Sequence, residues 1–220
     1  VRPAVFAARG WYPASANACR ASTRELLDEA SSILAGRELP EAPVAGLVPH
    51  AGWRYSGLTA AAVFRALADR TTPERLVLFS AVHVRGVSRP TLWDGGPWET
   101  PIGPLFPFDD GLGELGFDAA TDPHQGEHSI EVQLPFVRAL WPDVRIAVVM
   151  VPPTEEAPGA GRRVAALLDD LGGTSLAIGT TDLTHYGPRY GFAPRGVGRE
   201  AHRWVVEEND RGVVDLVAAL

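Results

Sequence analysis

Side chains that can bind metal ions or move protons recur at one kind of position in this sequence, the end of an apolar run. His50 and His83 each end such a run, and Asp182 and His185 lie in the last part of a third. Imidazole nitrogens and carboxylate oxygens are common ligands of transition metals, and imidazole also titrates near neutral pH. If the runs are neighbouring strands, these residues predict a shared polar site.

The elements that would position these residues can be predicted from hydrophobic periodicity. Continuous apolar runs typical of buried strands cover residues 42–50, 75–83, 145–152 and 175–185. Helical periodicity covers residues 25–36, 56–70 (with Ser56 as the N-cap), 158–171, a segment from Ser129 toward Trp141, and most of the chain from Val197. Residues 89–116 are too rich in Pro and Gly for a helix and predict a short antiparallel excursion or an ordered loop.

This alternation predicts an α/β fold whose central sheet is mainly parallel or mixed, with helices on both faces. Ligands of such sheets bind outside the carboxyl ends of the strands. His50, His83, His128 and His185, four of the six histidines, should therefore lie at or near one rim.

Composition excludes several classes of protein. The 220 residues carry 20 basic and 27 acidic side chains, a net charge of −7, which disfavours a nucleic-acid-binding module. Every basic residue is Arg, so a Schiff-base lysine and a lysine-dependent phosphate loop are both excluded. No apolar run approaches the roughly 20 residues that a membrane span needs, and no signal segment opens the chain, so we expect a cytoplasmic protein without a membrane partner.

The single cysteine, Cys19, rules out an internal disulfide and any site built from several thiolates. It stands in the polar stretch ASANACRAST, which predicts a loop far from any strand end. A reactive thiol needs a base or a helix N-terminus beside it, so we expect Cys19 to be inert.

The sequence HQGEH at residues 124–128 matches the inverted zinc-peptidase motif H-x-x-E-H. That motif needs one helix to present both histidines to the same metal. Pro123 and Gly126 disfavour such a helix, although a zinc hydrolase using His124 and His128 stays open as an alternative.

Six ordered motifs resemble those of the Memo family, which includes component B of the bacterial AmmeMemoRadiSam set. They are RGWYPAS (9–15), VPHAGWRYSG (48–57), SAVH (80–83), WETPIGP (98–104), GEHSIEVQLPF (126–136) and TTDLTHYGPRYGF (180–192). The resemblance implies a fold similar to the catalytic subunit of class III extradiol ring-cleavage dioxygenases, which are non-haem Fe(II) enzymes.

The resemblance also implies roles for particular residues. His50 and His83 match the two histidine ligands of the family's metal site. Asp182 and His185 match acid–base residues, with His185 in the place of the dioxygenase's proton-transferring histidine. Glu127 and His128 match the family's EHS pocket motif, so we count all of the last four as catalytic candidates.

Two departures from the family pattern stand out. The usual Gly-Pro-Ser-His at the second strand end is replaced by residues 79–83, FSAVH, which keep only the histidine. The family's third metal ligand is a Cys near the C-terminus, and the dioxygenases use a Glu. Because Cys19 does not align with that position, we expect the third ligand beyond Leu220 and treat residues 1–220 as a single Memo-like domain lacking its C-terminal segment.

Three functions are compatible with these residues. The first is a mononuclear non-haem oxidoreductase that uses Fe(II), with copper or zinc as alternative metals, and acts on a small-molecule or peptide ligand. The second is a non-catalytic Memo-like binding or accessory protein with a vestigial dioxygenase pocket. The third is the zinc hydrolase described above.

Overall fold

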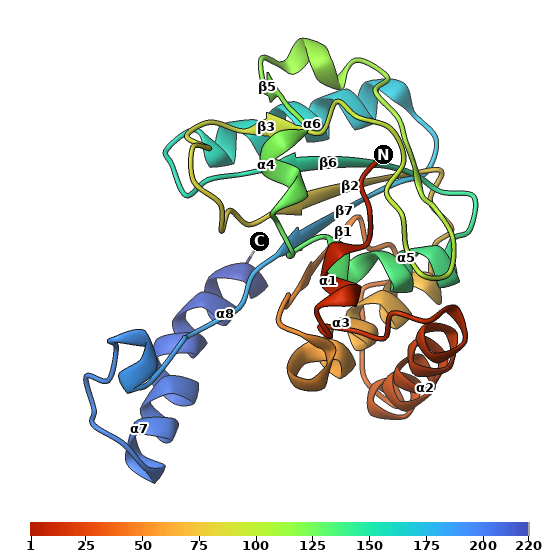
Figure 1. The fold of residues 1–220 in the computed structure, drawn as a ribbon. Coiled ribbons are helices and arrows are strands. Elements are labelled where there is room, and N and C mark those ends of the chain that lie inside the picture. The colour runs from red at the N-terminus through yellow and green to blue at the C-terminus, as the bar shows by residue number, and fades with distance from the viewer. Residues whose placement is uncertain (220) are drawn as a thin grey trace. The chain divides into compact units, whose positions relative to one another are not determined.

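The structure is a computed structural model that describes residues 1–219. It separates into two compact units, Val1–Thr181 and the residues from Asp182 onward. The first unit contains a mixed sheet with the strand order β1-β7-β2-β6-β3-β5 (Figure 1). In addition, β4 pairs with β6. The strands are β1 (Ala45–Val48), β2 (Arg75–Ser80), β3 (Thr91–Leu92), β4 (Phe106–Pro107), β5 (Asp118–Ala119), β6 (Arg145–Met150) and β7 (Ser175–Thr180).

Parallel pairing dominates this sheet. Among the described residues, β3 and β6 form the antiparallel pair, and the other named strand pairs are parallel. Parallel strands need crossover connections, which the helices supply. The predicted α/β class with a mainly parallel or mixed sheet is confirmed. The similarity to dioxygenase subunits stays a prediction.

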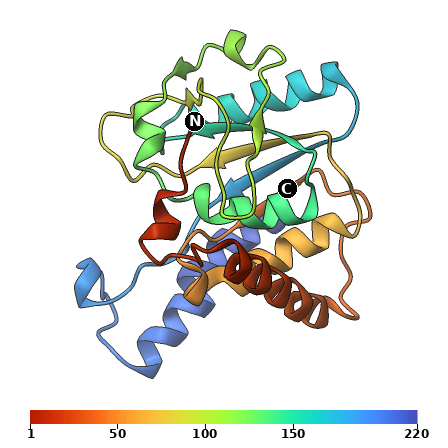
Figure 2. The ribbon, with the colours of Figure 1, turned by 45° about the vertical axis from the view of Figure 1, so that its right-hand side comes forward.

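Helices cover both faces of the sheet. They are α1 (Val5–Ala8), α2 (Ala16–Leu34), α3 (Trp53–Ala68), α4 (Asp122–Gln125), α5 (Leu134–Leu140) and α6 (Ala157–Leu171), with 3₁₀ turns at Leu112–Leu115 and Glu131–Gln133. Figures 1 and 2 show α2, α3 and α5 on one side of the sheet and α6 on the other.

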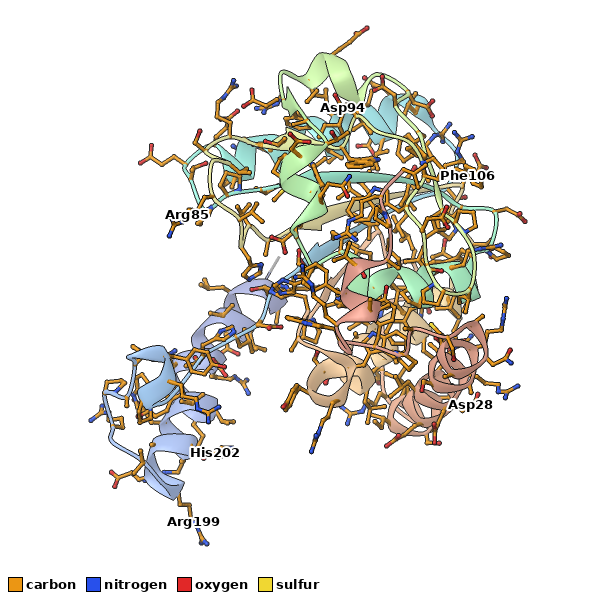
Figure 3. All side chains as sticks on the ribbon, in the orientation of Figure 1. Asp28, Arg85, Asp94, Phe106, Arg199 and His202 are labelled. Carbon is orange, nitrogen blue, oxygen red and sulfur yellow. The ribbon has the colours of Figure 1, made fainter. Side chains whose placement is uncertain are left out.

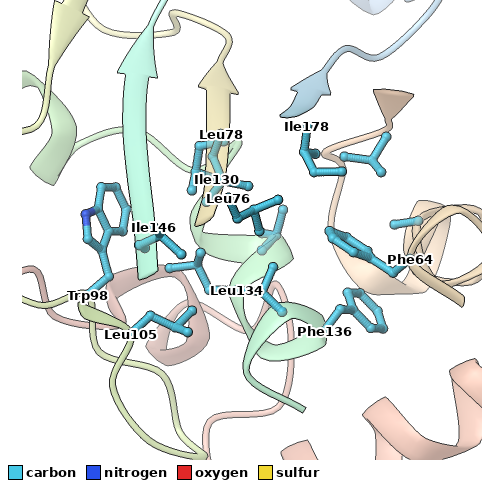
Figure 4. Close-up of a cluster of buried hydrophobic side chains, with 14 of the residues drawn as sticks. Phe64, Leu76, Leu78, Trp98, Leu105, Ile130, Leu134, Phe136, Ile146 and Ile178 are labelled. Atoms are coloured by element: carbon cyan, nitrogen blue, oxygen red, sulfur yellow. The ribbon is translucent and has the colours of Figure 1, made fainter. Parts of the chain in front are cut away.

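The side chains of β2 show why two layers of helices are needed. Leu76 and Leu78 point into the larger core, and Val77, between them, points into the smaller one. Figure 4 shows the larger core, in which Phe64 of α3 stacks on Phe136 of α5. Each large apolar side chain buried in this way contributes about 1.5–3 kcal/mol, so covering both faces stabilises the central strands.

All four strands that were predicted from apolar runs are present as β1, β2, β6 and β7, and each is shorter than the run that predicted it. β1 ends at Val48 and β2 at Ser80, so His50 and His83 lie in the loops that follow these strands. The segment 89–116 contains the short strand β3, antiparallel to β6, which agrees with the first of the two predicted alternatives; it also contains β4, which is parallel to β6. Polar side chains at the ends of apolar runs thus mark the loops.

Helix α2 begins nine residues before the predicted helix 25–36. Ser15 is its N-cap, and the Ser15 hydroxyl accepts a hydrogen bond from the Ala18 N–H at 3.3 Å. Cys19 therefore lies inside a helix, fully buried, and the prediction of a loop at Cys19 was wrong. Alanine is the best helix former, and Ala16, Ala18 and Ala21 outweigh the polar residues around them.

Helix α3 also begins earlier than the predicted 56–70. Gly52 is its N-cap position, and Ser56 sits within the first turn, so the predicted N-cap was wrong. The Ser56 hydroxyl donates to the Ala51 carbonyl at 3.0 Å. The Trp53 N–H at the start of the helix donates to the Trp11 carbonyl at 2.9 Å, so this N–H has an acceptor without a capping side chain.

The expected helix from Ser129 toward Trp141 is present with a different start. A 3₁₀ turn, Glu131–Gln133, precedes α5, so Ser129 does not cap the helix. The Ser129 N–H instead donates to the side chain of Glu127 at 2.9 Å. That interaction belongs to the site described below.

The second unit is mainly helical from α7 (Arg199–Trp204) through a π-helical turn (Val205–Asn209) to α8 (Asp210–Ala218), in agreement with the helix predicted from residue 197. A 3₁₀ turn at Pro188–Tyr190 precedes them. Asp210 accepts a hydrogen bond from the Thr184 N–H at 3.0 Å, which ties the start of this unit to its last helix.

Across residues 1–219, none of the helices combines the length and the apolar character required to cross a bilayer.

Candidate metal centre

Three imidazole rings meet near the carboxyl ends of β1 and β2. His50 follows β1, His83 follows β2, and His128 lies between α4 and the 3₁₀ turn that precedes α5. The ring centroids of His83 and His128 are 4.3 Å apart, and His50 lies 5.0 Å from His83 and 5.5 Å from His128. We call these three residues the histidine cluster.

The histidine cluster can hold a metal ion. One nitrogen from each ring lies within 4.8 Å of the other two. Metal–nitrogen bonds are about 2.0–2.1 Å long, so the rings would move slightly inward on binding. The side chain of His83 is 42% exposed and that of His128 is 14% exposed, whereas His50 is buried, so solvent reaches the cluster beside His83.

A buried carboxylate organises two of the three histidines. Glu127 accepts hydrogen bonds from the backbone N–H groups of His83 at 2.7 Å and of His128 and Ser129 at 2.9 Å. The Glu127 Oε1 atom also lies 2.9 Å from Nδ1 of His83. The loop after β2 and the segment before α5 are therefore joined through one side chain.

These hydrogen bonds keep Glu127 ionised. Burial alone would raise the pKa of Glu127, but hydrogen bonds from the His83 side chain and from the Ser129 and His83 N–H groups outweigh burial and lower the pKa to about 2. An ionised carboxylate can only accept hydrogen bonds, so the His83 Nδ1 carries a proton. In the neutral ring the lone pair is then on Nε2, the tautomer that a metal-binding histidine with a carboxylate partner adopts.

Aromatic rings pack on His128. Trp11 lies 4.4 Å from its ring and Phe6 lies 5.5 Å away, centroid to centroid. Packing of this kind restricts ring rotation, so His128 is held by Trp11 and Phe6 while Glu127 fixes its backbone.

A buried ion pair holds the N-terminal segment against the segment that carries Glu127. The Arg2 guanidinium pairs with Glu131, and both side chains are fully buried. Arg2 also donates to the carbonyl groups of Glu127 at 2.8 Å and of His124 at 3.2 Å. Arg2 thus supports the backbone from which Glu127 and His128 project.

Glu131 has further donors around it. Its Oε1 atom accepts hydrogen bonds from the N–H groups of Phe6 at 2.6 Å and Ala7 at 3.1 Å, and from the Tyr12 hydroxyl at 3.0 Å. Burial, and then the nearby charge of Glu131, raises the pKa of Tyr12 well above its ordinary value, so Tyr12 remains a hydrogen-bond donor. Sequence reasoning missed Arg2 and Glu131, which are too far apart in the chain to form a recognisable motif.

Hydrogen bonds also join the loops that carry His50 and His83 to the segment after His128. The Gln133 side chain donates to the Pro49 carbonyl at 2.8 Å, and the hydroxyls of Ser80 and Ser129 lie 2.8 Å apart. Pro49 and Ser80, which precede the first two histidines, therefore contact the same segment.

The structure brings together four of the six residues predicted for the site: His50, His83, Glu127 and His128. Asp182 and His185 belong to the second unit, where Nε2 of His185 lies 3.9 Å from Oδ2 of Asp182. Their predicted acid–base role stays a prediction.

The zinc-peptidase arrangement of the HQGEH motif is not formed. Helix α4 contains His124 but ends at Gln125, and His124 does not join the histidine cluster. Its ring instead lies edge-on to Trp93, 5.6 Å away, and burial lowers the pKa of His124 to about 4. Because Gly126 terminates the helix, His124 and His128 do not share a helix face.

These observations define a class: an α/β protein with a mixed sheet and a three-histidine candidate metal site after its strands. The chain belongs to the Memo family, because the family model described as Memo-like protein matches residues 2–220. A MEMO1 family protein of Thermococcus onnurineus is 35% identical over 162 residues, which cover 68% of this chain and 55% of the relative. One from Pyrococcus abyssi is 35% identical, over 74% of this chain and 60% of the relative.

The chain spans a little over half the length of these curated relatives. The predicted family membership is confirmed by the comparisons.

We expect Glu127→Gln to weaken metal binding by about 10–100-fold, as loss of the carboxylate partner of a histidine ligand does. Gln has the same shape as Glu but lacks its charge. Its amide N–H₂ would also face backbone N–H groups that now donate hydrogen bonds to Glu127, so donors would face donors. The measurement is a competition titration with a metal indicator. Glu114→Gln, on the 3₁₀ turn Leu112–Leu115, is the matched control and should leave the affinity unchanged. An affinity equal to that of the unmodified chain in Glu127→Gln would show that the carboxylate does not support the site.

Proposed function

We propose that the chain binds one metal ion through His50, His83 and His128, and that the bound metal serves a non-haem oxidoreductase activity of the kind implied by the Memo resemblance. One observation carries the proposal: three imidazole nitrogens lie within 4.8 Å of one another. A lone buried histidine is common in proteins, but three converging rings with an ionised glutamate behind one of them match the pattern of a metal centre.

The donor set favours a transition metal. Imidazole suits iron, copper, zinc and nickel, whereas calcium and magnesium prefer oxygen ligands. Fe(II) is the metal that we propose, with copper and zinc as alternatives. When bound, Fe(II) would supply the redox chemistry with oxygen that histidine side chains cannot.

The residues of this chain have separate tasks in the proposal. Glu127 orients His83 and keeps its proton on Nδ1. Trp11 packs on His128 and keeps that ring in place. His128 is the third ligand that the described residues offer. We further propose that His185 and Asp182 move protons during the reaction.

The test compares the full chain with the double variant His50→Ala/His83→Ala by metal analysis after purification and by oxygen uptake with Fe(II) and catechol as the probe. We expect close to one metal per unmodified chain and almost none in the double variant, with oxygen uptake lost in parallel. His202→Ala removes an exposed histidine of α7 and is the control for a general effect of losing imidazole.

The outcomes separate the candidate functions. A double variant that keeps its metal would overturn the site. Metal bound by the histidine cluster without oxygen uptake would instead favour the non-catalytic binding protein. Loss of metal on replacing His124 would restore the zinc-peptidase alternative.

A further inference from the structure

A cavity lined by arginines lies away from the histidine cluster, between α2, α3 and α5. Its volume is about 540 Å³, within the range of small-molecule sites. Four arginines line it, from three different helices: Arg20 and Arg24 of α2, Arg65 of α3 and Arg138 of α5. The arginines therefore converge through the packing of the helices.

The charge of this cavity is opposite to that of the chain. The whole sequence carries a net charge of −7, yet the cavity has four arginines and a single acidic residue, Asp28, which is labelled on α2 in Figure 3. Like charges held close together repel, and this cost is relieved when an anion binds between them. Four guanidinium groups around one cavity thus favour an anionic occupant.

Several of these guanidinium groups have hydrogen-bond donors to spare. Among the described residues, no carboxylate lies within 4.0 Å of Arg20, Arg24 or Arg138, whereas Arg65 pairs with Asp69. Within residues 1–219, the Nε atoms of Arg65 and Arg138 are buried and have no hydrogen-bond partner. A buried donor without an acceptor costs about 1–3 kcal/mol, and an oxygen of a ligand in the cavity would relieve that cost.

The remainder of the cavity wall is largely apolar. Leu27 of α2, Ile102, Ala139 of α5 and Pro142 line it beside the arginines. A wall of this kind suits the carbon skeleton of a ligand, while guanidinium groups bind phosphate or carboxylate oxygens in pairs. Inorganic anions alone would leave the apolar part uncovered.

We propose that this cavity binds a small organic molecule carrying two or more negative charges, either phosphate or carboxylate groups. The site is separate from the histidine cluster, shares none of its residues, and does not depend on the proposed metal function.

The experiment is isothermal titration calorimetry on the full, metal-depleted chain, with tripolyphosphate and citrate as probes. We expect one binding site per chain for at least one probe, and the tighter of the two identifies the anionic group. Arg20→Ala/Arg24→Ala should weaken that binding by at least about tenfold, because charge-assisted hydrogen bonds are lost.

The matched control is Arg37→Ala/Arg70→Ala, which removes two exposed arginines that do not line the cavity. It should change the dissociation constant by less than about twofold, since exposed distant charges are screened. The His50→Ala/His83→Ala variant should bind the probe as the unmodified chain does.

Three results would overturn the proposal. In the first, neither probe binds. In the second, the two double arginine variants lose probe affinity equally. In the third, the His50→Ala/His83→Ala variant loses probe affinity and Arg20→Ala/Arg24→Ala does not. The last would place the anion at the histidine cluster. Metal binding and anion binding are measured separately, so either proposal can fail without the other.

Discussion

Replacing Glu131 by alanine is expected to lower the free energy of unfolding by about 3–5 kcal/mol, the usual cost of leaving one member of a buried ion pair alone. The Arg2 guanidinium is fully buried and would lose its counter-charge. The N–H groups of Phe6 and Ala7 would lose their acceptor at the same time. A loss of this size is a large part of the stability of a typical domain.

The measurement is equilibrium unfolding in urea. Asp118→Ala breaks the exposed pair between Arg89 and Asp118 and should cost less than about 1 kcal/mol, as exposed pairs do. Glu131→Gln keeps a carbonyl oxygen as an acceptor but removes the charge. The decrease in its free energy of unfolding therefore measures the loss of the ion pair with Arg2. If Glu131→Ala is no more destabilising than Asp118→Ala, the buried pair does not anchor the N-terminal segment.

Stability is also expected to fall as the pH drops from about 6.5 to about 4, and His124 should account for about 3 kcal/mol of the loss. Burial, and to a lesser extent the charge of Arg2, lowers the pKa of His124 in the folded chain from an ordinary value of 6.5 to about 4. The carbonyl of Thr91 and the charge of Glu127 act in the opposite direction but do not outweigh burial. Between these two pH values the unfolded chain binds the proton more tightly, so protonation favours unfolding. Above pH 6.5 His124 is neutral in both states and contributes no such loss.

Unfolding free energies of the unmodified chain and of His124→Gln, measured across that interval, test this expectation. Gln stays neutral, so the variant should lose less stability on acidification, by about the same 3 kcal/mol. His202→Ala removes an exposed histidine and should leave the profile unchanged. Parallel pH profiles for the unmodified chain and His124→Gln would contradict a buried neutral imidazole.

The sheet and the positions of two site histidines could be predicted because both depend on local patterns. A buried parallel strand needs a continuous apolar run, and the first polar residues after the run lie at the end of the strand. That reasoning placed His50 and His83 at the ends of two strands, and the structure places them shortly after β1 and β2, with ring centroids 5.0 Å apart. Family membership came from ordered motifs, and the family model agrees.

Helix starts were less predictable because capping preference competes with propensity and with tertiary contacts. Ser56 has the right chemistry for an N-cap, yet α3 begins at Trp53, whose indole N–H donates to the Val132 carbonyl at 2.7 Å. Cys19 was assigned to a loop because its neighbours are polar, although their helix propensity favoured α2. Tertiary hydrogen bonds such as that of Trp53 leave no signal in a single sequence.

The supports of the histidine cluster were also beyond reach from the sequence. Glu127 was singled out as a catalytic candidate, but its observed contacts are with backbone N–H groups and His83, which depend on how the chain folds around it. Arg2 and Glu131 are separated by more than half of the chain. Pairing between such distant residues becomes visible only in three dimensions.

The hydrogen bonds of Arg2 and Glu131 make two distant segments one cooperative unit. If residues 2–12 open, the carbonyl of Glu127 loses its donor and His128 loses the ring of Trp11; if the segment around Glu131 opens, Phe6 and Ala7 lose their acceptor. Neither can unfold locally while the other keeps its native contacts. A ligand that binds only the closed form of His128 would therefore make the opening of the N-terminal residues less favourable, although it touches none of them.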